Sequence, residues 1–396
     1  MSILTPLNGK SVFVTGHTGF KGSWLCMWLN ELGAKVTGYS LDPPTEPNNF
    51  TASGVREVLH RHHRRDIRDV ETLSAAMRET QPDLVLHLAA QSVVREGYEQ
   101  PRETFDVNVM GTIGVLESVR ALGRPCSVIC VTSDKCYENV EQVWGYRECD
   151  AMGEHDPYGG SKGAAELAIR SYRHSFFPPD DHARHGVKLA SCRAGNVIGG
   201  GDWTKDALIV DVVKALAGNE PVTLRSPEAF RPWQHVLQAL SGYLTLASKL
   251  LTSDDPRFCS AWNFGPVPGN ELPVREVVEI FQEAWGRSGW VDASDPNNPH
   301  EANILRLSID KALWELGWRP CWDVHEVLRQ TAKWYQRYTD EGGSMREFTL
   351  GQIRAYQQDL ERSVASHVFQ PTIGGLGDYE DASVPDRADA MTAQGG

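Results

Sequence analysis

A tyrosine and a lysine four residues apart could together remove a proton from a hydroxyl group. Tyr158 and Lys162 share one face if their segment is helical, because positions i and i+4 are neighbours on a helix. A phenol with a pKa of about 10 is a poor base at neutral pH, but a nearby cation stabilises the phenolate. Tyr158 could then accept a proton while a hydride leaves the same carbon. The alternative is an ordinary surface contact, so the surrounding sequence must decide.

A second group of polar residues follows a predicted strand. Residues 127–132 form an apolar, β-rich segment that delivers Ser133, Asp134 and Lys135 at its carboxyl end. In open α/β sheets, ligands bind beyond the carboxyl ends of the strands. A hydroxyl, an acid and an amine opposite a tyrosine–lysine pair would form a set that can move protons. The alternative interpretation is a helix cap with solvated charges.

A glycine-rich turn between a strand and a helix predicts a dinucleotide site. Residues 12–15 predict the strand, residues 23–25 begin the helix, and the turn has the spacing GxxGxxG. Such a turn aims backbone amides and a positive helix end at a pyrophosphate. The cofactor-binding residues expected in it are Gly16, His17, Thr18, Gly19, Phe20, Lys21 and Gly22. His17 and Lys21 are unusual there, and they either add charge near the phosphates or cap the loop in solvent.

The residues after the second predicted strand bear on the choice of cofactor. An acid in that place would bind the adenosine ribose and favour NAD over NADP. The expected position holds Ser40, with Asp42 two residues later, which weakens this ribose contact and leaves NADP as the alternative. NAD is the expected cofactor and Asp42 the candidate ribose ligand. Asp66 and Ile67 lie where a loop could contact the adenine. The alternative role for Asp66 is a helix N-cap.

The order of these segments predicts an α/β fold with a doubly wound parallel sheet of the Rossmann type. Apolar strand-like runs alternate with helical patterns up to about residue 194. The expected strands are 11–15, 35–40, 84–88, 127–132 and 188–192. The expected helices are 24–32, 70–79, 102–122 and 161–177, followed by 208–217, 237–251, 274–285 and 324–338.

The change of rhythm after Gly199 predicts a second, smaller domain of mixed α/β structure. We expect a cofactor domain over 9–195 and a substrate domain over 196–345. The segments 222–224 and 262–264 could be strands that return to the first sheet. The polar segment 363–396 predicts a disordered or loosely draped tail.

Composition excludes several classes of partner. A formal charge of −13 argues against binding to nucleic acid. No apolar run is long enough to span a membrane, so we expect a cytoplasmic protein without a membrane partner. The eight cysteines form no CxxC pair and no metal-like cluster, so no metal site is expected. An anionic substrate would require local cations in this negative chain.

Longer motifs resemble the extended short-chain dehydrogenase/reductases that act on nucleotide sugars. The general resemblance lies in GxxGxxG, HLAAQ (87–91), NVMG (108–111) and the YxxxK pair. More narrowly, TGHTGFKGSWL (15–25), TSDKCYEN (132–139), WGYRE (144–148), DPYGGSKGAAEL (156–167), GNVIGGGDW (195–203), RPWQHV (231–236) and NFGP (263–266) resemble the CDP-glucose 4,6-dehydratase family. The likeness covers about residues 9–334.

This resemblance implies roles for individual residues. Tyr158 would start oxidation at sugar carbon 4, with Lys162 on the nicotinamide ribose, and Asp134 would protonate the hydroxyl that leaves carbon 6. Lys135 replaces a glutamate of related dehydratases and would remove the carbon 5 proton, unless a water-mediated route or Glu138 does so. A lysine base must have a pKa well below its usual value of about 10.4. The resemblance adds Leu88, Ala89, Ala90 and Thr132 to the cofactor-binding residues.

The cations that a nucleotide-sugar substrate requires are also implied by the resemblance. Arg231 would contact the phosphates, with an ordinary surface ion pair as the alternative, and Asn196 would lie near the sugar diphosphate. Arg193 and His235 are weaker candidates, and Trp203 either stacks on the base or packs in the interior.

The resemblance also implies a homodimer and a place in deoxysugar biosynthesis for lipopolysaccharide O-antigen. One competing hypothesis is another nucleotide-sugar dehydratase or a 4-epimerase, although an epimerase needs no acid–base pair for elimination. The other is a non-catalytic dinucleotide-binding module, although such a module typically lacks the tyrosine or the lysine.

Overall fold

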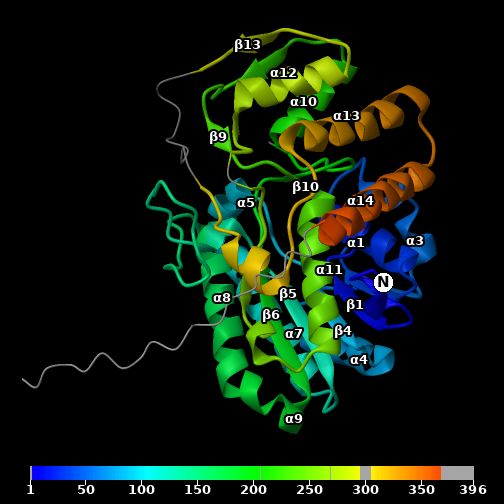
Figure 1. The fold of residues 1–396 in the computed structure, drawn as a ribbon, viewed down its shortest axis with the longest axis vertical. Helices are drawn as coiled ribbons and strands as arrows, with labels where there is room; N and C mark the ends of the chain where they lie inside the picture. The colour runs from blue at the N-terminus through cyan, green and yellow to red at the C-terminus, as the bar shows by residue number, and fades with distance from the viewer. Residues whose placement is uncertain (1, 206, 268, 295–304, 367–396) are drawn as a thin grey trace, which may run out of the picture.

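A seven-stranded sheet forms the centre of the molecule. The computed structural model describes residues 2–205, 207–267, 269–294 and 305–366 (Figure 1). The strand order is β11-β6-β5-β4-β1-β2-β3, and all pairs are parallel. The strands are β1 Ser11–Thr15, β2 Lys35–Ser40, β3 Arg61–Arg64, β4 Leu84–His87, β5 Cys126–Val131, β6 Val187–Arg193 and β11 Ala261–Asn263. The predicted doubly wound parallel sheet is confirmed.

Helices cover both faces of this sheet, so its central strands are buried on both sides. One face packs against α1 (Phe20–Glu31) and α11 (Val236–Thr252). The other packs against α4 (Val70–Thr80), α7 (Gly111–Arg120) and α8 (Pro157–Ser175). The helix expected over 102–122 is divided into α6 (Pro101–Phe105), the π-helical turn η2 (Asp106–Met110) and α7.

The later half of the chain contributes both to the sheet and to a second lobe. β11 pairs with β6, so the prediction that residues near 262–264 return to the sheet is confirmed. β8 (Val222–Leu224) instead pairs with β13 (Trp290–Asp292), so the same prediction for 222–224 is wrong. The lobe above the sheet in Figure 1 also holds α10 (Leu208–Ala217), α12 (Val274–Ala284) and α13 (Val324–Glu341).

Shorter elements connect these layers. The short helices are η1 Thr5–Leu7, α2 Asn49–Ala52, α3 Val55–Val58, α5 Val94–Glu99, η3 Asp134–Cys136, η4 Pro179–Asp181, α9 His182–His185, η5 Pro256–Phe258 and η6 Ala312–Leu316. The short strands are β7 Val197–Ile198, β9 Phe230–Arg231, β10 Gln234–His235 and β12 Leu272–Pro273. β9 pairs with β12, and β10 pairs with β7.

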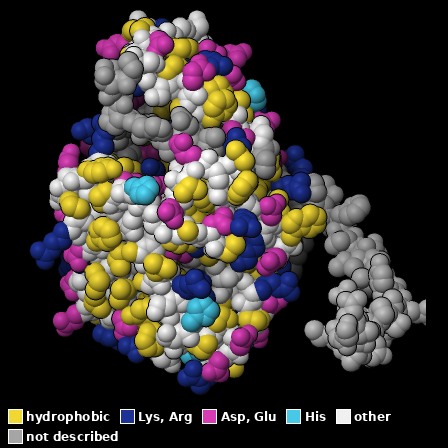
Figure 2. All heavy atoms as spheres, turned by 90° about the vertical axis from the view of Figure 1, so that its left-hand side faces the viewer, with side chains coloured by type: hydrophobic (Ala, Val, Ile, Leu, Met, Phe, Trp, Pro, Cys, Tyr) yellow, Lys and Arg dark blue, Asp and Glu magenta, His cyan; other side chains and the backbone are white. Residues whose placement is uncertain are grey.

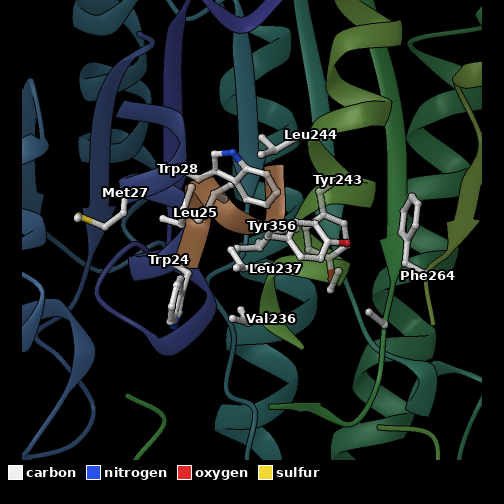
Figure 3. Packing of buried hydrophobic residues seen from close by; sticks show 14 of the residues in the cluster. Trp24, Leu25, Met27, Trp28, Val236, Leu237, Tyr243, Leu244, Phe264 and Tyr356 are labelled. Atoms are coloured by element: carbon white, nitrogen blue, oxygen red, sulfur yellow. The ribbon is translucent and has the colours of Figure 1, made fainter. Parts of the chain in front are cut away.

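A final helix, α14 (Arg346–Ser366), packs against both α1 and α13 and was not predicted. Its Tyr356 is buried between Trp28 of α1 and Trp322 ahead of α13, as the close-up shows for Trp28 and Tyr356 (Figure 3). The helix continues to Ser366, so the tail expected from residue 363 begins within it. Residues 367–396 lie outside the described part of the chain. No helix of the described residues is both long and apolar enough to cross a bilayer.

Candidate active site

The glycine turn is packed too tightly for side chains at two of its positions. Gly16 has φ +74°, and a Cβ there would lie 2.6 Å from the Ala89 amide nitrogen. A Cβ on Gly22 would lie 2.1 Å from the Gly16 carbonyl oxygen. The turn therefore presents bare backbone at the start of α1, beside Leu88 and Ala89. This geometry fits a dinucleotide pyrophosphate.

His17 turns into the protein rather than toward a ligand. Its ring is fully buried and packs edge-on against Phe50 and His62, over the backbone of Gly38. Burial lowers the pKa of His17 to about 3, so the ring is neutral. Both predicted roles, a charge near the phosphates and a cap in solvent, are wrong for this residue.

Lys21 behaves differently from its neighbour in the turn. It lies in the first turn of α1, where the carboxylates of Asp134 and Asp202 act on it. Burial lowers the pKa of Lys21, while these two acids oppose the change. Lys21 is half-buried, and its charge acts on the same edge of the sheet as Asp134, which favours a charge near the phosphates over a cap in solvent.

At the adenosine end, Ser40 and Thr18 join the turn to β2. Their hydroxyl oxygens are 2.8 Å apart, and Thr18 also donates to the Leu41 carbonyl. Asp42 is exposed and forms an ion pair with Arg64 at 2.8 Å. Asp42 therefore stays a candidate ribose ligand whose carboxylate already has a cationic partner.

The predictions for the loop before α4 need correction. Asp66 pairs with Arg68 at 2.6 Å, whereas Asp69 caps α4 by accepting from the Thr72 amide. The alternative role of Asp66 as an N-cap is therefore wrong. The side chain of Ile67 is buried in the core, and a Cβ on Gly111 would lie 2.5 Å from its Cδ1. Ile67 cannot offer this side chain to an adenine.

Tyr158 and Lys162 lie buried in the first turns of α8. Asp156 caps the helix by accepting from the Gly159 amide at 3.0 Å. The Lys162 Nζ lies 5.9 Å from the centre of the Tyr158 ring. Burial raises the pKa of Tyr158, while a hydrogen bond with the Ser133 hydroxyl opposes this change. Burial, followed by repulsion from Lys21, lowers the pKa of Lys162 to about 8.

Asp134 lines a cleft beyond the carboxyl ends of β5 and β6. One carboxylate oxygen accepts from the Ser133 hydroxyl and from the Lys135 amide, both at 2.9 Å. The cleft has a volume of about 280 Å³, and its lining includes Asp134, Gly195, Gln234, Pro266, Arg306 and Trp144. Lys135 is half-buried in η3 and is not part of the lining, and Glu138 is exposed.

Three of the expected proton-handling residues, Ser133, Asp134 and Tyr158, therefore meet at one edge of the sheet, whereas the Lys135 side chain does not line the cleft. Ser133 contacts both Asp134 and Tyr158, and it joins the loop after β5 to helix α8. Thr132 makes no such contact with the cleft, because its hydroxyl donates to Glu166 at 2.5 Å. Beside the glycine turn lie the half-buried residues Leu88, Ala89 and Ala90. The Thr15 hydroxyl accepts from the backbone amides of Leu88 and Ala89.

Two of the predicted substrate ligands are occupied inside the protein. Arg193 is buried and forms an ion pair with Glu166 at 2.9 Å. His235 is fully buried, caps α11 and packs against Trp24 and Trp322. Neither side chain faces the cleft, so their assignment as phosphate contacts is wrong.

The other three predicted substrate ligands are Asn196, Arg231 and Trp203, and the first two lie next to the cleft. Asn196 follows the cleft residue Gly195 and has φ +48°. Arg231 precedes the cleft residue Pro232 and donates to the Phe230 carbonyl at 2.8 Å. Trp203 packs against Tyr335 and Tyr338, with ring centres 5.2 and 5.5 Å apart, which favours the interior role over base stacking.

Gly195 is a site residue that the sequence analysis missed. A Cβ at this position would lie 1.7 Å from Asp134 Oδ2, so glycine alone lets β6 end against this carboxylate. The residue stands in GNVIGGGDW, but a glycine after a strand gives no signal of its partner. Among the described residues, no group of three His, Cys, Asp or Glu side chains could hold a metal ion.

We expect Gly195→Ala to lower the free energy of unfolding by about 1–3 kcal/mol, because the added methyl group displaces Asp134. In an Asp134→Ala background the same change should cost less than about 0.5 kcal/mol. Urea unfolding of the four proteins in this cycle checks the expectation. Gly351→Ala, which meets no atom within 4 Å, is the control. An equal loss in both backgrounds would show that Asp134 is not the obstructing group.

Comparisons with known proteins identify the family to which the chain belongs. The model of the family described as GDP-mannose 4,6 dehydratase matches residues 13–255. A CDP-glucose 4,6-dehydratase of Salmonella typhimurium strain LT2 is 48% identical over 330 residues, which cover 83% of this chain and 91% of the relative. A dTDP-glucose 4,6-dehydratase of Xanthomonas campestris is 25% identical and covers 81% and 92%.

Solved structures show the same fold. A UDP-glucose 4-epimerase of Thermus thermophilus in complex with NAD superimposes with a TM-score of 0.68 and 27% identity, over 82% of this chain and 98% of that one. The family match spans more than half of the chain, and the resemblance expected from the motifs is confirmed. The chain therefore belongs to the GDP-mannose 4,6-dehydratase family, as a relative of CDP-glucose 4,6-dehydratase.

Proposed function

We propose that this protein converts CDP-glucose to CDP-4-dehydro-6-deoxy-glucose, with NAD as a bound cofactor. One observation carries the proposal: an acid, Asp134, lines the cleft and is joined through Ser133 to the buried Tyr158–Lys162 pair. The 48% identity to a CDP-glucose 4,6-dehydratase supports the choice of sugar nucleotide.

The tyrosine–lysine pair would begin the reaction by removing the proton of the carbon 4 hydroxyl. NAD, held at the glycine turn, would supply a hydride acceptor at carbon 4 and return that hydride at carbon 6. A hydrogen bond from the Ser133 hydroxyl, once it turns from Asp134, would stabilise the Tyr158 phenolate, and the positive charge of Lys162 would act in the same direction. Burial opposes the phenolate, so both partners are needed.

Asp134 and Lys135 would complete the elimination. A ketone at carbon 4 acidifies the proton on carbon 5, which the Lys135 amine removes directly or through a water molecule. Asp134, once it has taken up a proton, gives it to the hydroxyl that leaves carbon 6 as one water molecule. When the hydride returns to carbon 6, the protonated Lys135 amine, whose protons exchange with solvent, gives a proton back to carbon 5. Asn196 and Arg231, which flank the lining of the cleft, would hold the diphosphate.

The proposed reaction is tested by analysis of the product from CDP-, dTDP-, GDP- and UDP-glucose in deuterium oxide. We expect rapid turnover of the CDP sugar, loss of one water molecule and one solvent deuterium at carbon 5. A hexose epimerised at carbon 4 that keeps its 6-hydroxyl would contradict the proposal.

The two proton-transfer roles are separated by two substitutions. Tyr158→Phe should block reduction of the bound cofactor and lower turnover by at least about 100-fold, because the base is lost. Lys135→Ala should permit that reduction but stop before water is lost. Rapid-mixing absorbance of reduced nicotinamide distinguishes the two variants. Near-normal turnover of Lys135→Ala would exclude the lysine as the carbon 5 base.

We propose that the protein works as a homodimer in the cytoplasm and serves deoxysugar biosynthesis for O-antigen. Large apolar side chains are exposed along α6, η2 and α8, namely Phe105, Met110, Leu167 and Phe176. Hydrophobic side chains gather on the face of the molecule that carries α8 (Figure 2). Such an area favours burial against a second copy.

Leu167→Asp should convert the dimer to a monomer of 44.0 kDa, because it places a charge in the proposed interface. Light scattering after gel filtration measures the mass. Val291→Asp alters a similarly exposed apolar residue on β13 and should leave the dimer intact. A Leu167→Asp protein with the mass of the unaltered one would contradict this interface.

A further inference from the structure

A buried polar network lies beneath the site and takes no part in the proposed proton transfers. Its members are Glu166, Arg193 and Tyr137, none of which is more than 4% exposed. Apolar residues of similar volume often stabilise a protein as well as a buried ion pair does. The stability of the fold alone is therefore a weak reason for this network.

Glu166 attaches the helix of the tyrosine–lysine pair to two strand ends. It lies on α8 one turn after Lys162, on the same face. Its carboxylate accepts from Thr132 at 2.5 Å, at the end of β5, and from Ser191 at 2.8 Å, on β6. Thr132 immediately precedes the Ser133–Asp134 segment, so these bonds fix the distance between the two halves of the site.

Arg193 extends the network to the other side of the acid. It donates to Glu166 at 2.9 Å and to the Tyr137 hydroxyl at 2.6 Å, and its guanidinium lies 5.0 Å from the centre of the Tyr137 ring. Tyr137 follows Lys135 by two residues and donates to Asn263 at 2.8 Å, at the end of β11. The segment that carries Asp134 and Lys135 is thus held at both ends.

The network is charged as well as hydrogen-bonded. Burial alone would raise the pKa of Glu166, but the charge of Arg193 and the hydrogen bonds from Arg193, Thr132 and Ser191 lower it overall. Glu166 is therefore a carboxylate, and Thr132, Ser191 and Arg193 all donate hydrogen bonds to it. A neutral amide in its place would lose the pairing with Arg193 and leave a buried cation behind.

We propose that Tyr137, Arg193 and Glu166 are positioning residues that hold the Asp134–Lys135 segment in register with Tyr158 and Lys162. The inference rests on the proposed dehydration, because it assigns the two halves of the site to oxidation and elimination. The network couples the halves, so loss of a link should slow elimination more than oxidation. A merely structural network would lower stability and slow both steps alike.

Tyr137→Phe tests this inference with the smallest change. It removes the hydroxyl that joins Arg193 to Asn263 and keeps the ring. We expect turnover of CDP-glucose to fall by about tenfold or more with KM within about threefold, because small displacements of a reacting group are costly. In a single turnover, reduced nicotinamide should accumulate well above the level in the unaltered enzyme.

Tyr356→Phe is the matched control, because it removes a buried hydroxyl that lies 3.1 Å from Ser241 in the core. It should change neither turnover nor the transient. Glu166→Gln is a second probe and should also raise the amount of reduced nicotinamide that accumulates. Glu166→Asp keeps the carboxylate, so its turnover should lie above that of Glu166→Gln. Circular dichroism melting of each variant separates these effects from loss of folding.

Three results would count against the inference. If Tyr137→Phe matches Tyr356→Phe in turnover and in the accumulation of reduced nicotinamide, the inference fails while the proposed function stands. The same holds if oxidation and elimination slow in proportion to a lower melting temperature. If the unaltered enzyme turns CDP-glucose into an epimer, there is no elimination to position, and both the inference and the proposed function fail.

Discussion

Close approach of backbone to side chain at the carboxyl edge of the sheet is the constraint on which the site depends. The end of β6 meets the carboxylate of Asp134 at Gly195, and the glycine turn meets the loop after β4 at Gly16. Neither contact leaves space for a Cβ. The parallel order of the strands brings these loops to one edge, and their tight packing gives Asp134 a single place beside Tyr158.

The sequence predicted the elements whose signals are local. The apolar runs of β1 and β2 and the amphipathic pattern of α10 agree with the structure in their bounds. The spacing of Tyr158 and Lys162 placed both on one helical face, and the strand before Ser133 placed this residue beside them. Periodicity and spacing suffice in these cases because the information lies within a few residues.

Elements and residues whose roles are set by distant partners could not be predicted. β3 consists of arginine and histidine and has no apolar run, so only its pairing with β2 reveals it. α14 is largely polar, and its packing depends on a few residues such as Tyr356. Arg193 has the chemistry of a phosphate ligand, but burial beside Glu166 gives it another role, as burial does for His17.

The central claim is that one sugar ring meets the base, the acid and one cofactor in a single cleft. It is tested by turnover of an equimolar mixture of CDP-glucose deuterated at carbon 4 and CDP-glucose labelled with carbon-13, followed by mass analysis of the product. The account predicts deuterium in the carbon 6 methyl group of molecules without carbon-13, because the hydride leaves and returns within one site. Deuterium in carbon-13 molecules, or its loss to solvent, would contradict the account.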